Sequence, residues 1–406
     1  MQPLLTGLRV VEGSAFIAAP LCGMTLSQLG ADVIRFDQIG GGIDYRRWPV
    51  TADNQSIYWA ELNKGKRSFA VDLRSERGQE LVAELICAGD RDGGIFATNL
   101  PARRRLSYDS LSQRRGDVIQ LEIVGDRHGR VAVDYTVNCK VGLPLVTGYP
   151  DDERPVNHVL PAWDNIAAYQ AALSIIAAER HRLLTGEGQR IKMALADVAL
   201  ATMGHLGFIG EVMINDADRE RLGTHLYGAL GRDFVTADGV RLMVLAVSAR
   251  QWKGLVTVTE SSESMAALEK ASKADFSKEG DRFLARNHIC ELFHAWISQH
   301  HFADVATAFD ANGVCWGKYQ TVRELVESDV DVSTDNPMFS KVTQPDIGEY
   351  LVSGQPMSFS AVNRAPVRPA PRLGEHTDEI LAETLGLSSV DIGRLHDEGV
   401  VAGVAE

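Results

Sequence analysis

Residues 7–37 read GLRVVEGSAFIAAPLCGMTLSQLGADVIRFD, and the architecture of the chain follows from them. The β-branched run LRVVE (8–12) predicts a strand, and ADVIRFD (31–37) predicts a second. Between them, Pro20 in a first helical turn and Gly30 just past the last one are the usual start and stop signals of a helix. A strand-helix-strand crossover of this length joins parallel strands, so the sequence predicts a parallel α/β sheet.

The rest of the first half repeats this alternation. Further strands are predicted for residues 67–73, 93–100 and 118–125, and a helix for residues 75–89. The first half is therefore interpreted as an open α/β sheet with helices on its faces.

The middle of the chain has a different pattern. FVTADGVRLMVLAV (234–247) predicts two strands around a turn, and helices rich in charge follow it. We therefore expect a smaller α+β domain at residues 223–330 and a large domain made of residues 1–222 and 331–406. A Pro-rich segment near the end leads into a helix for which Thr377 is the expected N-cap.

Composition excludes several classes of function. The 406 residues are 45% hydrophobic, enough for roughly two to three domains. The formal net charge of −13 disfavours nucleic acid as a partner. The N-terminal residues show no charged leader with an apolar run, and no run of about 18 uncharged apolar residues occurs, so we expect a cytoplasmic protein that does not contact a membrane. Five widely spaced cysteines without a CxxC pair predict neither disulfides nor a metal site.

The strand-helix-strand start raises the question of dinucleotide binding. Asp37 ends the second strand, where a carboxylate that holds a ribose would stand. The first turn, however, reads EGSAFIAAP and has one glycine instead of the G-x-G-x-x-G fingerprint. The sequence therefore argues against nicotinamide chemistry.

Basic side chains gather in three loops of the first half. Arg and Lys in loops that follow the strands of an α/β sheet are well placed to hold an anionic cofactor, although exposed charge is also the ordinary state of a surface. The three groups are Arg46 and Arg47, then Lys64, Lys66 and Arg67, and then Arg103, Arg104 and Arg105.

Asp164 stands where a long apolar helix begins. Ile166, Tyr169, Leu173 and Ile176 follow it at helical spacing, and Asp is a preferred N-cap. The positive end of the helix dipole also favours the ionised form that a carboxylate nucleophile needs. The local sequence therefore permits either role for Asp164, the N-cap of the helix or a nucleophile.

Four blocks in order make the chain resemble the family III CoA transferases, the group that includes formyl-CoA transferase, carnitine CoA-transferase and 2-methylacyl-CoA racemase. The blocks are residues 7–37 quoted above, LNKGKRSFAVDLRSERGQELV (62–82), LLTGEGQRIKMALADVAL (183–200) and PAPRLGEHTDEIL (369–381). The resemblance covers almost the whole chain. It implies a Rossmann-like large domain with a smaller inserted domain, in two chains interlocked as a homodimer.

The resemblance assigns the chemistry to Asp164. In the family an aspartate at this place attacks an acyl-CoA thioester and carries CoA as an aspartyl thioester, so CoA is part of the substrate and no cofactor is tightly bound. A narrower resemblance, in NHVLPAWD (157–164), GHLGFIGEVMINDADR (204–219), YGALGRDF (227–234) and STDNPMF (333–339), is to the part of the family that moves CoA from C1 to C4 of mesaconyl-CoA, a branched unsaturated C4-dicarboxylate thioester.

The resemblance also implies a CoA site. Phe16, Ile17 and Ala18 would line the pantetheine channel, Leu73 and Arg74 would flank the adenine, and Asn99 and Leu100 would border the thioester, with Arg104 on a CoA phosphate. Where the family often has a phosphate-binding Arg, this chain has Gln38, so we assign that contact to Arg46 and Arg47. The glutamine found beside the reacting carbonyl in formyl-CoA transferase is Ile17 here, which argues against oxalate and formate as substrates.

Three other functions remain open at this point. One is intermolecular transfer of CoA to a free carboxylic acid, and another is CoA binding without catalysis. The third is 2-methylacyl-CoA racemisation, which needs a His–Asp pair, but residues 130–142 contain Asp134 and no histidine, and His158 is a lone candidate. Candidates to hold a second substrate carboxylate are Arg47, His205, His225 and Arg232.

Overall fold

The computed structural model describes residues 2–89, 92–102 and 104–404, which fall into two compact units. The larger contains Met1–Val141, His158–Met213 and Val330–Glu406, and the smaller contains Gly142–Asn157 and Ile214–Asp329. Residues 142–157 and 214–222 thus group with the smaller unit, whereas the sequence placed them in the large domain. Arg221 holds these two segments together, because its guanidinium donates to the backbone oxygens of Leu145 and Arg154 at 2.8 Å each.

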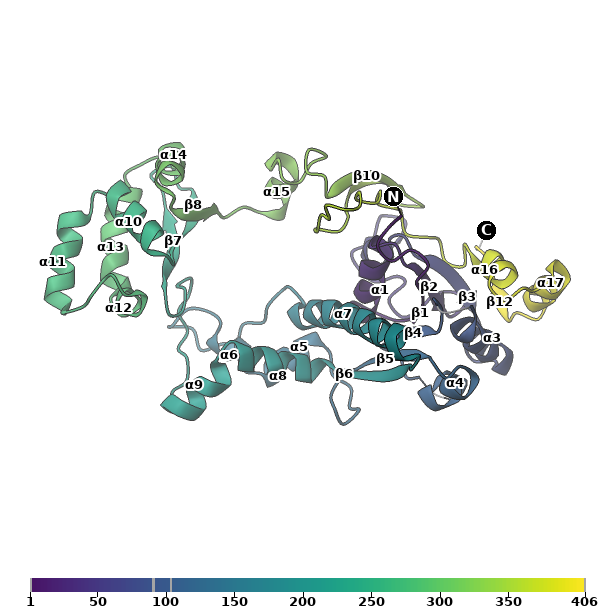
Figure 1. The fold of residues 1–406 in the computed structure, drawn as a ribbon. Helices are drawn as coiled ribbons and strands as arrows, with labels where there is room; N and C mark the ends of the chain where they lie inside the picture. Colours follow the sequence, from purple (N-terminus) through teal and green to yellow (C-terminus); the bar gives the residue numbers. More distant parts are fainter. Residues whose placement is uncertain (1, 90–91, 103, 405–406) are drawn as a thin grey trace. The chain divides into compact units, whose positions relative to one another are not determined.

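A seven-stranded sheet forms the centre of the larger unit (Figure 1). Its order is β12-β3-β2-β1-β4-β5-β6, in which β1 to β6 are parallel and β12 is antiparallel to β3. The predicted parallel sheet is confirmed, and the order of β1 to β6 is that of doubly wound nucleotide-binding folds. The strands are β1 (Arg9–Gly13), β2 (Asp32–Asp37), β3 (Arg67–Val71), β4 (Ile95–Thr98), β5 (Ile119–Val124), β6 (Gln189–Ala194) and β12 (Val401–Ala402).

Helices cover both faces of this sheet. Val11, Ile34 and Phe36 point to a core shared with α3, α4, α16 and α17. Alternate residues point the other way, and Val33 on that face lies beside Gly23 of α1. The helices of the larger unit are α1 (Ala18–Gln28), α2 (Ile57–Leu62), α3 (Glu76–Cys87), η1 (Arg104–Leu106), α4 (Tyr108–Arg114), α5 (Asp134–Lys140), α7 (Ala162–Thr185), α8 (Leu195–His205), α16 (Thr377–Glu383) and α17 (Ser389–Asp397), with α9 (Phe208–Asn215) at its border.

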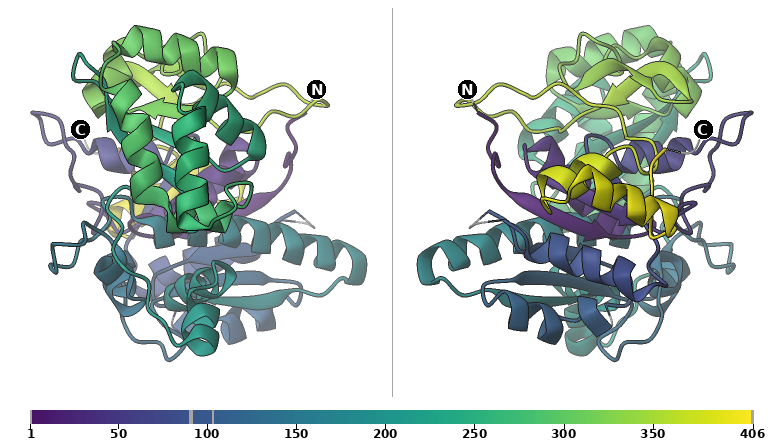
Figure 2. Two further views of the ribbon diagram at one scale, coloured as in Figure 1. Left: turned by 90° about the vertical axis from the view of Figure 1, so that its left-hand side faces the viewer. Right: turned by 90° about the vertical axis from the view of Figure 1, so that its right-hand side faces the viewer.

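The C-terminal segment returns to the N-terminal strands (Figure 2, where it is yellow). A hairpin of β10 (Phe339–Gln344) and β11 (Gly348–Ser353) precedes it. Thr377 was predicted as the N-cap of the tail helix, and this is wrong, because α16 begins at Thr377 and its N-cap is His376. The Thr377 hydroxyl instead joins two strands, accepting from the Ala70 N–H at 3.2 Å and donating to the Ala402 oxygen at 2.7 Å.

The smaller unit is an α+β structure around a three-stranded sheet of order β7-β8-β9. The predicted strand pair around TADG is confirmed, since β7 and β8 pair antiparallel up to Val235 and Arg241. Phe234, Leu242 and Phe293 lie in its core. Its elements are α6 (Leu143–Val146), β7 (Leu230–Val235), β8 (Arg241–Ala246), α10 (Ala249–Val258), α11 (Ser262–Ser272), α12 (Glu279–Leu284), α13 (Arg286–Ile297), α14 (Phe302–Asn312), β9 (Cys315–Lys318) and α15 (Val322–Ser328).

Two further features concern membranes and metals. Among the described residues no single helix is long and apolar enough to cross a membrane, although α8 and α9, bent by 57°, reach that length and composition as a pair. In the same residues no group of three or more His, Cys, Asp or Glu side chains is arranged to hold a metal ion.

Candidate active site

Strand order reverses at β1, and the predicted pantetheine and thioester residues meet there. Residues 16–18 follow β1, and residues 99 and 100 follow the neighbouring β4. Loops on the two sides of such a point diverge, which is where open α/β sheets bind ligands. Asn99 joins the two loops, because its side chain accepts from the Ala15 N–H at 2.9 Å and donates to the Ala15 oxygen at 2.7 Å.

The loop after β1 is held in a strained conformation. Phe16 has a φ of 64°, in the left-handed region that a bulky side chain rarely enters and that costs about 1–3 kcal/mol. Its N–H donates to Asp44 Oδ2 at 2.9 Å, which fixes this geometry. The helix that starts next, α1, has no side-chain cap at Ile17. Its first turn therefore presents the positive end of the helix dipole.

A buried ionic network lies beneath this loop. The Arg35 side chain is 1% exposed, and its guanidinium donates to Asp37 at 2.8 Å, to Asp44 at 3.1 Å and to Asn63 at 3.1 Å. A further bond of 3.1 Å reaches the Ser14 backbone oxygen. Arg35 therefore ties the ends of β1 and β2 to the carboxylate that orients Phe16.

The second basic group, in residues 64–67, is structural. Lys66 Nζ is fully buried and donates to Glu12 Oε1 at 2.8 Å, so it cannot reach a phosphate at the surface as proposed from the sequence. Burial is also the largest influence on the Lys66 ammonium and lowers its pKa. The other two cations are paired as well, Lys64 with Glu61 at 2.7 Å and Arg67 with Asp32 at 2.6 Å.

Arg47 is the cation of this region that faces the loop after β1. Its guanidinium lies 5.1 Å from the Phe16 ring centre and 5.5 Å from that of Tyr58. Burial raises the pKa of Tyr58 to about 12, and Arg47 opposes that rise while Asp164 adds to it. Arg47, Tyr58 and Asp164 are therefore within electrostatic reach of one another. The neighbouring Arg46 is exposed.

Helix α7 carries Asp164 to the same edge of the sheet. Near its last turn, Arg182 donates to the backbone oxygens of Gly93 at 2.7 Å and Asp117 at 3.2 Å, which precede β4 and β5. A 24-residue helix spans about 36 Å and a six-residue strand about 20 Å. The first turn of α7 therefore lies at the carboxyl edge. One turn after Asp164, Ala168 packs in one cluster with Ile17.

Asp164 does not cap α7, so of the two roles that the local sequence permits, the N-cap is not the one observed. The helix begins at Ala162 with Pro161 as the N-cap residue, so Asp164 is its third residue. The cap comes from Asp134, the first residue of α5, whose Oδ2 accepts from the N–H groups of Trp163 at 2.7 Å and Asp164 at 3.1 Å. Among the described residues, none donates a hydrogen bond to the Asp164 carboxylate, which is thus free for chemistry.

The environment of Asp164 favours its protonated form. Its pKa is raised to about 6, first by partial burial and then by the negative charge of Asp134, while Arg47 acts in the opposite direction. Burial and Asp134 therefore outweigh the helix dipole, which by itself favours the ionised form. A carboxylate with a pKa near neutrality is a stronger nucleophile than an ordinary surface aspartate, yet it is ionised at pH 7.

His158 completes this group of residues. Its Nε2 lies 2.7 Å from Asp134 Oδ1, and its ring contacts those of Tyr135 and Trp163 with centres 5.9 and 6.3 Å away. A His–Asp pair therefore stands directly behind Asp164. Sequence reasoning missed it because the two residues are 24 positions apart, and the available signal was a lone carboxylate, Asp134, at the start of a short helix.

The residues predicted to flank an adenine lie after β3. Gln38 fixes the position of this loop. The Leu73 N–H donates to Gln38 Oε1 at 3.0 Å, and Gln38 Nε2 donates to Asp72 at 3.0 Å. Gln38, noted as a departure from the family pattern, therefore anchors this loop. Arg74 is exposed and its side chain is free to bend over a ligand.

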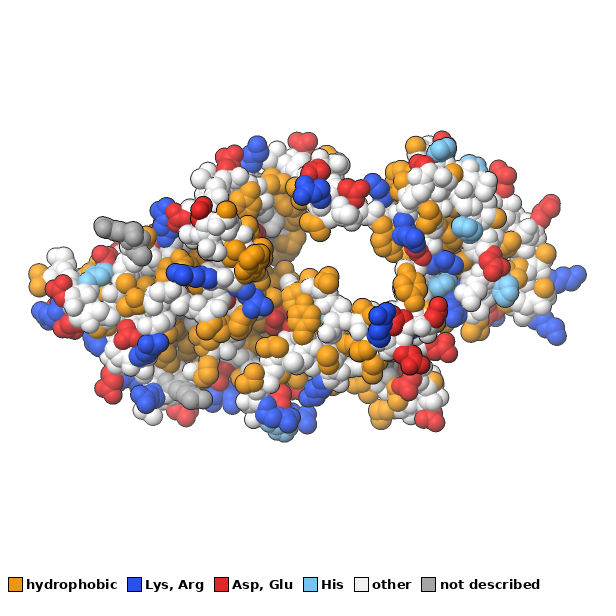
Figure 3. Space-filling view, turned by 180° about the vertical axis from the view of Figure 1, so that it is seen from behind, with side chains coloured by type: hydrophobic (Ala, Val, Ile, Leu, Met, Phe, Trp, Pro, Cys, Tyr) orange, Lys and Arg blue, Asp and Glu red, His pale blue; other side chains and the backbone are white. Residues whose placement is uncertain are grey.

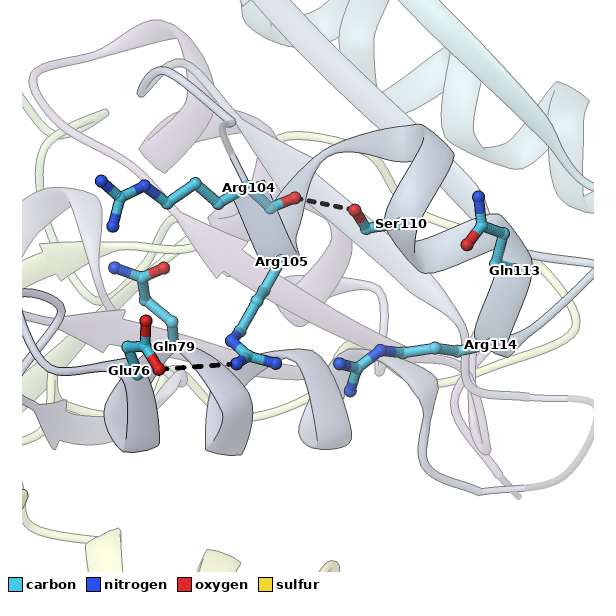
Figure 4. A pocket seen from close by; sticks show the side chains of 7 residues that line it. All are labelled: Glu76, Gln79, Arg104, Arg105, Ser110, Gln113 and Arg114. Carbon is cyan, nitrogen blue, oxygen red and sulfur yellow. Dashed lines mark hydrogen bonds and ion pairs between the residues drawn. The ribbon is translucent and has the colours of Figure 1, made fainter.

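Arg104 lies at a surface pocket of about 440 Å³ between α3 and the η1–α4 segment (Figure 4). Its backbone oxygen accepts from Ser110 at 2.9 Å, and its guanidinium extends toward Gln79. Arg105 and Arg114, by contrast, are paired with Glu80 at 2.7 and 2.6 Å. Arg103 lies outside the described residues.

The residues expected to bind the second carboxylate of the substrate fall into two groups. Arg47 interacts with Asp164 electrostatically, whereas His205 is exposed at the end of α8. His225 and Arg232 belong to the smaller unit, where they flank a turn closed by the Leu226 N–H on the Gly231 oxygen at 2.9 Å. Within the larger unit, Arg47 is therefore the candidate best supported by geometry.

Comparison with known proteins gives a consistent result. The family described as CoA-transferase family III matches residues 5–377. The chain is 57% identical over 404 residues, 99% of each protein, to the 2-methylfumaryl-CoA isomerase of Chloroflexus aurantiacus. It is 26% identical, over 98% of each protein, to the succinyl-CoA–D-citramalate CoA-transferase of the same species.

A solved structure agrees with the fold. A CAIB/BAIF family protein from Brucella suis superposes with a TM-score of 0.76 at 25% identity, over 94% of this chain and 100% of that one.

Proposed function

The chain belongs to CoA-transferase family III, and we propose that it isomerises 2-methylfumaryl-CoA (mesaconyl-CoA) by moving CoA from C1 to C4 of the same molecule. The observation that carries the proposal is the half-buried Asp164 carboxylate at the carboxyl edge of β1 and β4, which accepts no hydrogen bond from the described residues. Its elevated pKa, the facing Arg47 and the full-length likeness to a 2-methylfumaryl-CoA isomerase support the same assignment.

The first half of the reaction transfers CoA to the protein. An Asp164 oxygen attacks the C1 thioester carbonyl, the carbon–sulfur bond breaks, and a mixed anhydride and CoA thiolate result. The thiolate then attacks the Asp164 carbonyl of the anhydride, which forms an aspartyl-CoA thioester and releases the C1 carboxylate. The first-turn N–H groups of α1 are suited to stabilise the negative oxygen that develops at each attack.

The second half repeats these steps with the other end of the acid. The C4 carboxylate attacks the aspartyl thioester, and the released thiolate then attacks the C4 carbonyl, which restores the Asp164 carboxylate. Each covalent intermediate keeps the acyl group activated, so no ATP is needed. Water must be excluded, because hydrolysis of the anhydride or the thioester would end the cycle.

We assign the CoA moiety to the residues named from the sequence. Phe16, Ile17 and Ala18 line the pantetheine beside the Asn99–Leu100 loop, and the Asn99 bonds to Ala15 support this placement. Leu73 and Arg74 flank the adenine on the loop held by Gln38. Arg104 serves a phosphate, which is supported by its guanidinium in the pocket of Figure 4.

Arg47 is assigned to the free carboxylate of the substrate, and Arg46 to the CoA phosphates. Arg47→Gln should raise the KM for mesaconyl-C1-CoA by about 10-fold or more, since a charge-assisted bond to carboxylate is lost. It should also move the acid limb of kcat/KM to higher pH, because Arg47 favours the ionised form of Asp164. Arg323→Gln is the control, because this exposed arginine of α15 is paired with Glu327 at 2.9 Å and has no assigned role in binding. An unchanged KM in Arg47→Gln would remove Arg47 from this role.

The function is tested by incubating the purified protein with mesaconyl-C1-CoA and no added acid. We expect the C4 isomer to appear in a chromatographic assay. Isomer formation only after a free carboxylic acid is added would indicate the alternative, an intermolecular CoA transferase. No transfer under either condition would leave a CoA-binding protein without this catalytic activity.

One observation favours a second candidate, 2-methylacyl-CoA racemisation. That reaction requires an acid and a base near the α-carbon, and the Asp134–His158 pair lies beside Asp164. The discriminating measurement is incorporation of deuterium at the α-carbon of a saturated 2-methylacyl-CoA in D₂O. Our proposal expects none, since His158 Nε2 is directed at Asp134.

We propose further that two chains form an interlocked homodimer. Exposed apolar side chains support this, among them Leu173 on α7 at 68% and Met213 and Ile214 on α9 at 81% and 84%. Hydrophobic side chains over α9 are visible at the surface in Figure 3. Light scattering at micromolar concentration should give a dimer mass, and a stable monomer would contradict the assembly.

A further inference from the structure

Helix α7 starts without a side-chain cap of its own. Its N-cap residue is Pro161, which has no side-chain acceptor, and the preferred capping residue of this sequence, Asp164, lies three positions further on. The first-turn N–H groups of Trp163 and Asp164 are nevertheless satisfied, at 2.7 and 3.1 Å, by a single oxygen of Asp134. The cap therefore comes from a different helix, 30 residues earlier in the chain.

Asp134 is itself closely held. Its side chain is buried, and it is the first residue of α5, so the positive ends of α5 and α7 both face its carboxylate. Its second oxygen lies 2.7 Å from Nε2 of His158, which is wedged between the rings of Tyr135 and Trp163. Each oxygen of Asp134 thus has a fixed partner.

We propose that Asp134 and His158 are positioning residues for the transfer reaction: they cap α7 from outside and thereby leave both oxygens of Asp164 free and oriented for attack. The inference rests on the proposed function and deepens it. An aspartate in a first helical turn commonly turns back to bond a backbone N–H, and this would withdraw the nucleophile from the substrate. Because the N–H groups of Trp163 and Asp164 are already bonded to Asp134, they are not available to the Asp164 side chain.

Asp134 and His158 also affect the pH at which Asp164 ionises. The charged or titratable groups that face Asp164 are Asp134 from α5, Arg47 from the loop after β2 and Tyr58 from α2, and α1 contributes no charged side chain. The charge of Asp134 raises the pKa of Asp164, so its removal should lower that pKa. We expect His158 to act on Asp164 through Asp134, to which it is hydrogen-bonded.

The test compares Asp134→Asn, His158→Gln and the double variant with the unmodified protein. Asp134→Asn keeps an acceptor oxygen for α7 but removes the charge, and His158→Gln keeps a donor for Asp134. The chain offers a matched control on its surface: His396 and Asp378 form a pair with the same 2.7 Å separation between α17 and α16. His396→Gln and Asp378→Asn should leave kcat and its pH profile unchanged.

We expect Asp134→Asn and His158→Gln each to lower kcat by roughly 10- to 100-fold with KM changed less than about threefold. A neutral amide holds the α7 N–H groups more weakly than a carboxylate, and a carboxylate without His158 is less firmly placed, so Asp164 is less well positioned while CoA binding is intact. The double variant should be no slower than the slower single variant within about twofold, since both act through one contact. The acid limb of kcat/KM should lie at lower pH in Asp134→Asn. Multiplicative losses with an unmoved acid limb would overturn the proposal and leave a purely structural cap.

A second readout does not depend on the substrate. The Asp164 carboxyl resonance can be followed by ¹³C NMR in protein labelled at aspartate Cγ, and assigned by its loss in Asp164→Asn. Its titration midpoint should be about 6 in the unmodified protein and lower in Asp134→Asn. A shift with no isomerase activity in any protein would sink the proposed function alone, and an unshifted midpoint would sink the role of Asp134 alone.

Discussion

Asp164→Asn should abolish isomerisation of mesaconyl-C1-CoA, with kcat reduced by at least about 10³-fold. The reason is chemical: a neutral amide neither attacks the thioester nor forms the anhydride, and no other described carboxylate at this edge is both free of hydrogen bonds and unpaired. The measurement is the chromatographic rate of C4-isomer formation. Activity within tenfold of the unmodified protein would show that Asp164 is not the nucleophile.

The stability of Asp164→Asn shows whether its loss of activity comes from misfolding. The pKa of Asp164 is raised from 3.8 to about 6 on folding, so its ionised form destabilises the native state. That penalty is absent below pH 3.8, grows between 3.8 and 6, and is fully present above 6. Asp164→Asn should therefore increase the free energy of unfolding by about 1–3 kcal/mol at pH 8 and by only about 0.5 kcal/mol near pH 4, as measured by urea titration. An inactive variant that is also less stable at pH 8 would point to misfolding instead.

Arg35→Met should destabilise the larger unit by about 3–5 kcal/mol, enough to prevent its folding or to lower its unfolding temperature severely. Arg35 is 1% exposed and compensates Asp37 and Asp44, whose side chains are 3% and 2% exposed. Its loss leaves two buried carboxylates without a cation and frees the Asp44 side chain that holds Phe16. Thermal unfolding followed by circular dichroism measures the effect.

The matched control lies on the neighbouring strand. Arg9 pairs with Asp32 at 3.3 Å, with side-chain exposures of 28% and 34%, and Arg9→Met should change stability by less than about 1 kcal/mol. Arg35→Lys should not restore stability, because one ammonium cannot reach four acceptors in the planar arrangement of a guanidinium. Equal effects of Arg9→Met and Arg35→Met would contradict the assigned role of the buried network.

Strand and helix patterns in the sequence predicted the central sheet well. The β-branched runs at 8–12 and 31–37 became β1 and β2 within a residue, because strands buried on both faces leave a clear apolar signature. The resemblance to the family placed Asp164, Phe16 and Asn99 in one region, and the structure brings their loops together. The order of the strands could not be read from local patterns.

Sequence reasoning failed where a side chain acts through space. Lys66 was interpreted as a surface cation because its local sequence is basic, but its partner Glu12 lies 54 residues earlier. The signal was present, since a charged residue inside an apolar strand, such as Glu12 in β1 or Arg35 in β2, requires a buried partner. The cap of α7 was missed for the same reason, because Asp134 reaches it from another helix.

We expect CoA to move within one substrate molecule through Asp164. The test supplies mesaconyl-C1-CoA labelled with ¹³C in the acyl group together with excess unlabelled mesaconate, and measures the label in the C4 isomer by mass spectrometry. With intramolecular transfer the product keeps the full label. A product whose label is diluted by the free acid would contradict intramolecular transfer and make the protein an intermolecular CoA transferase.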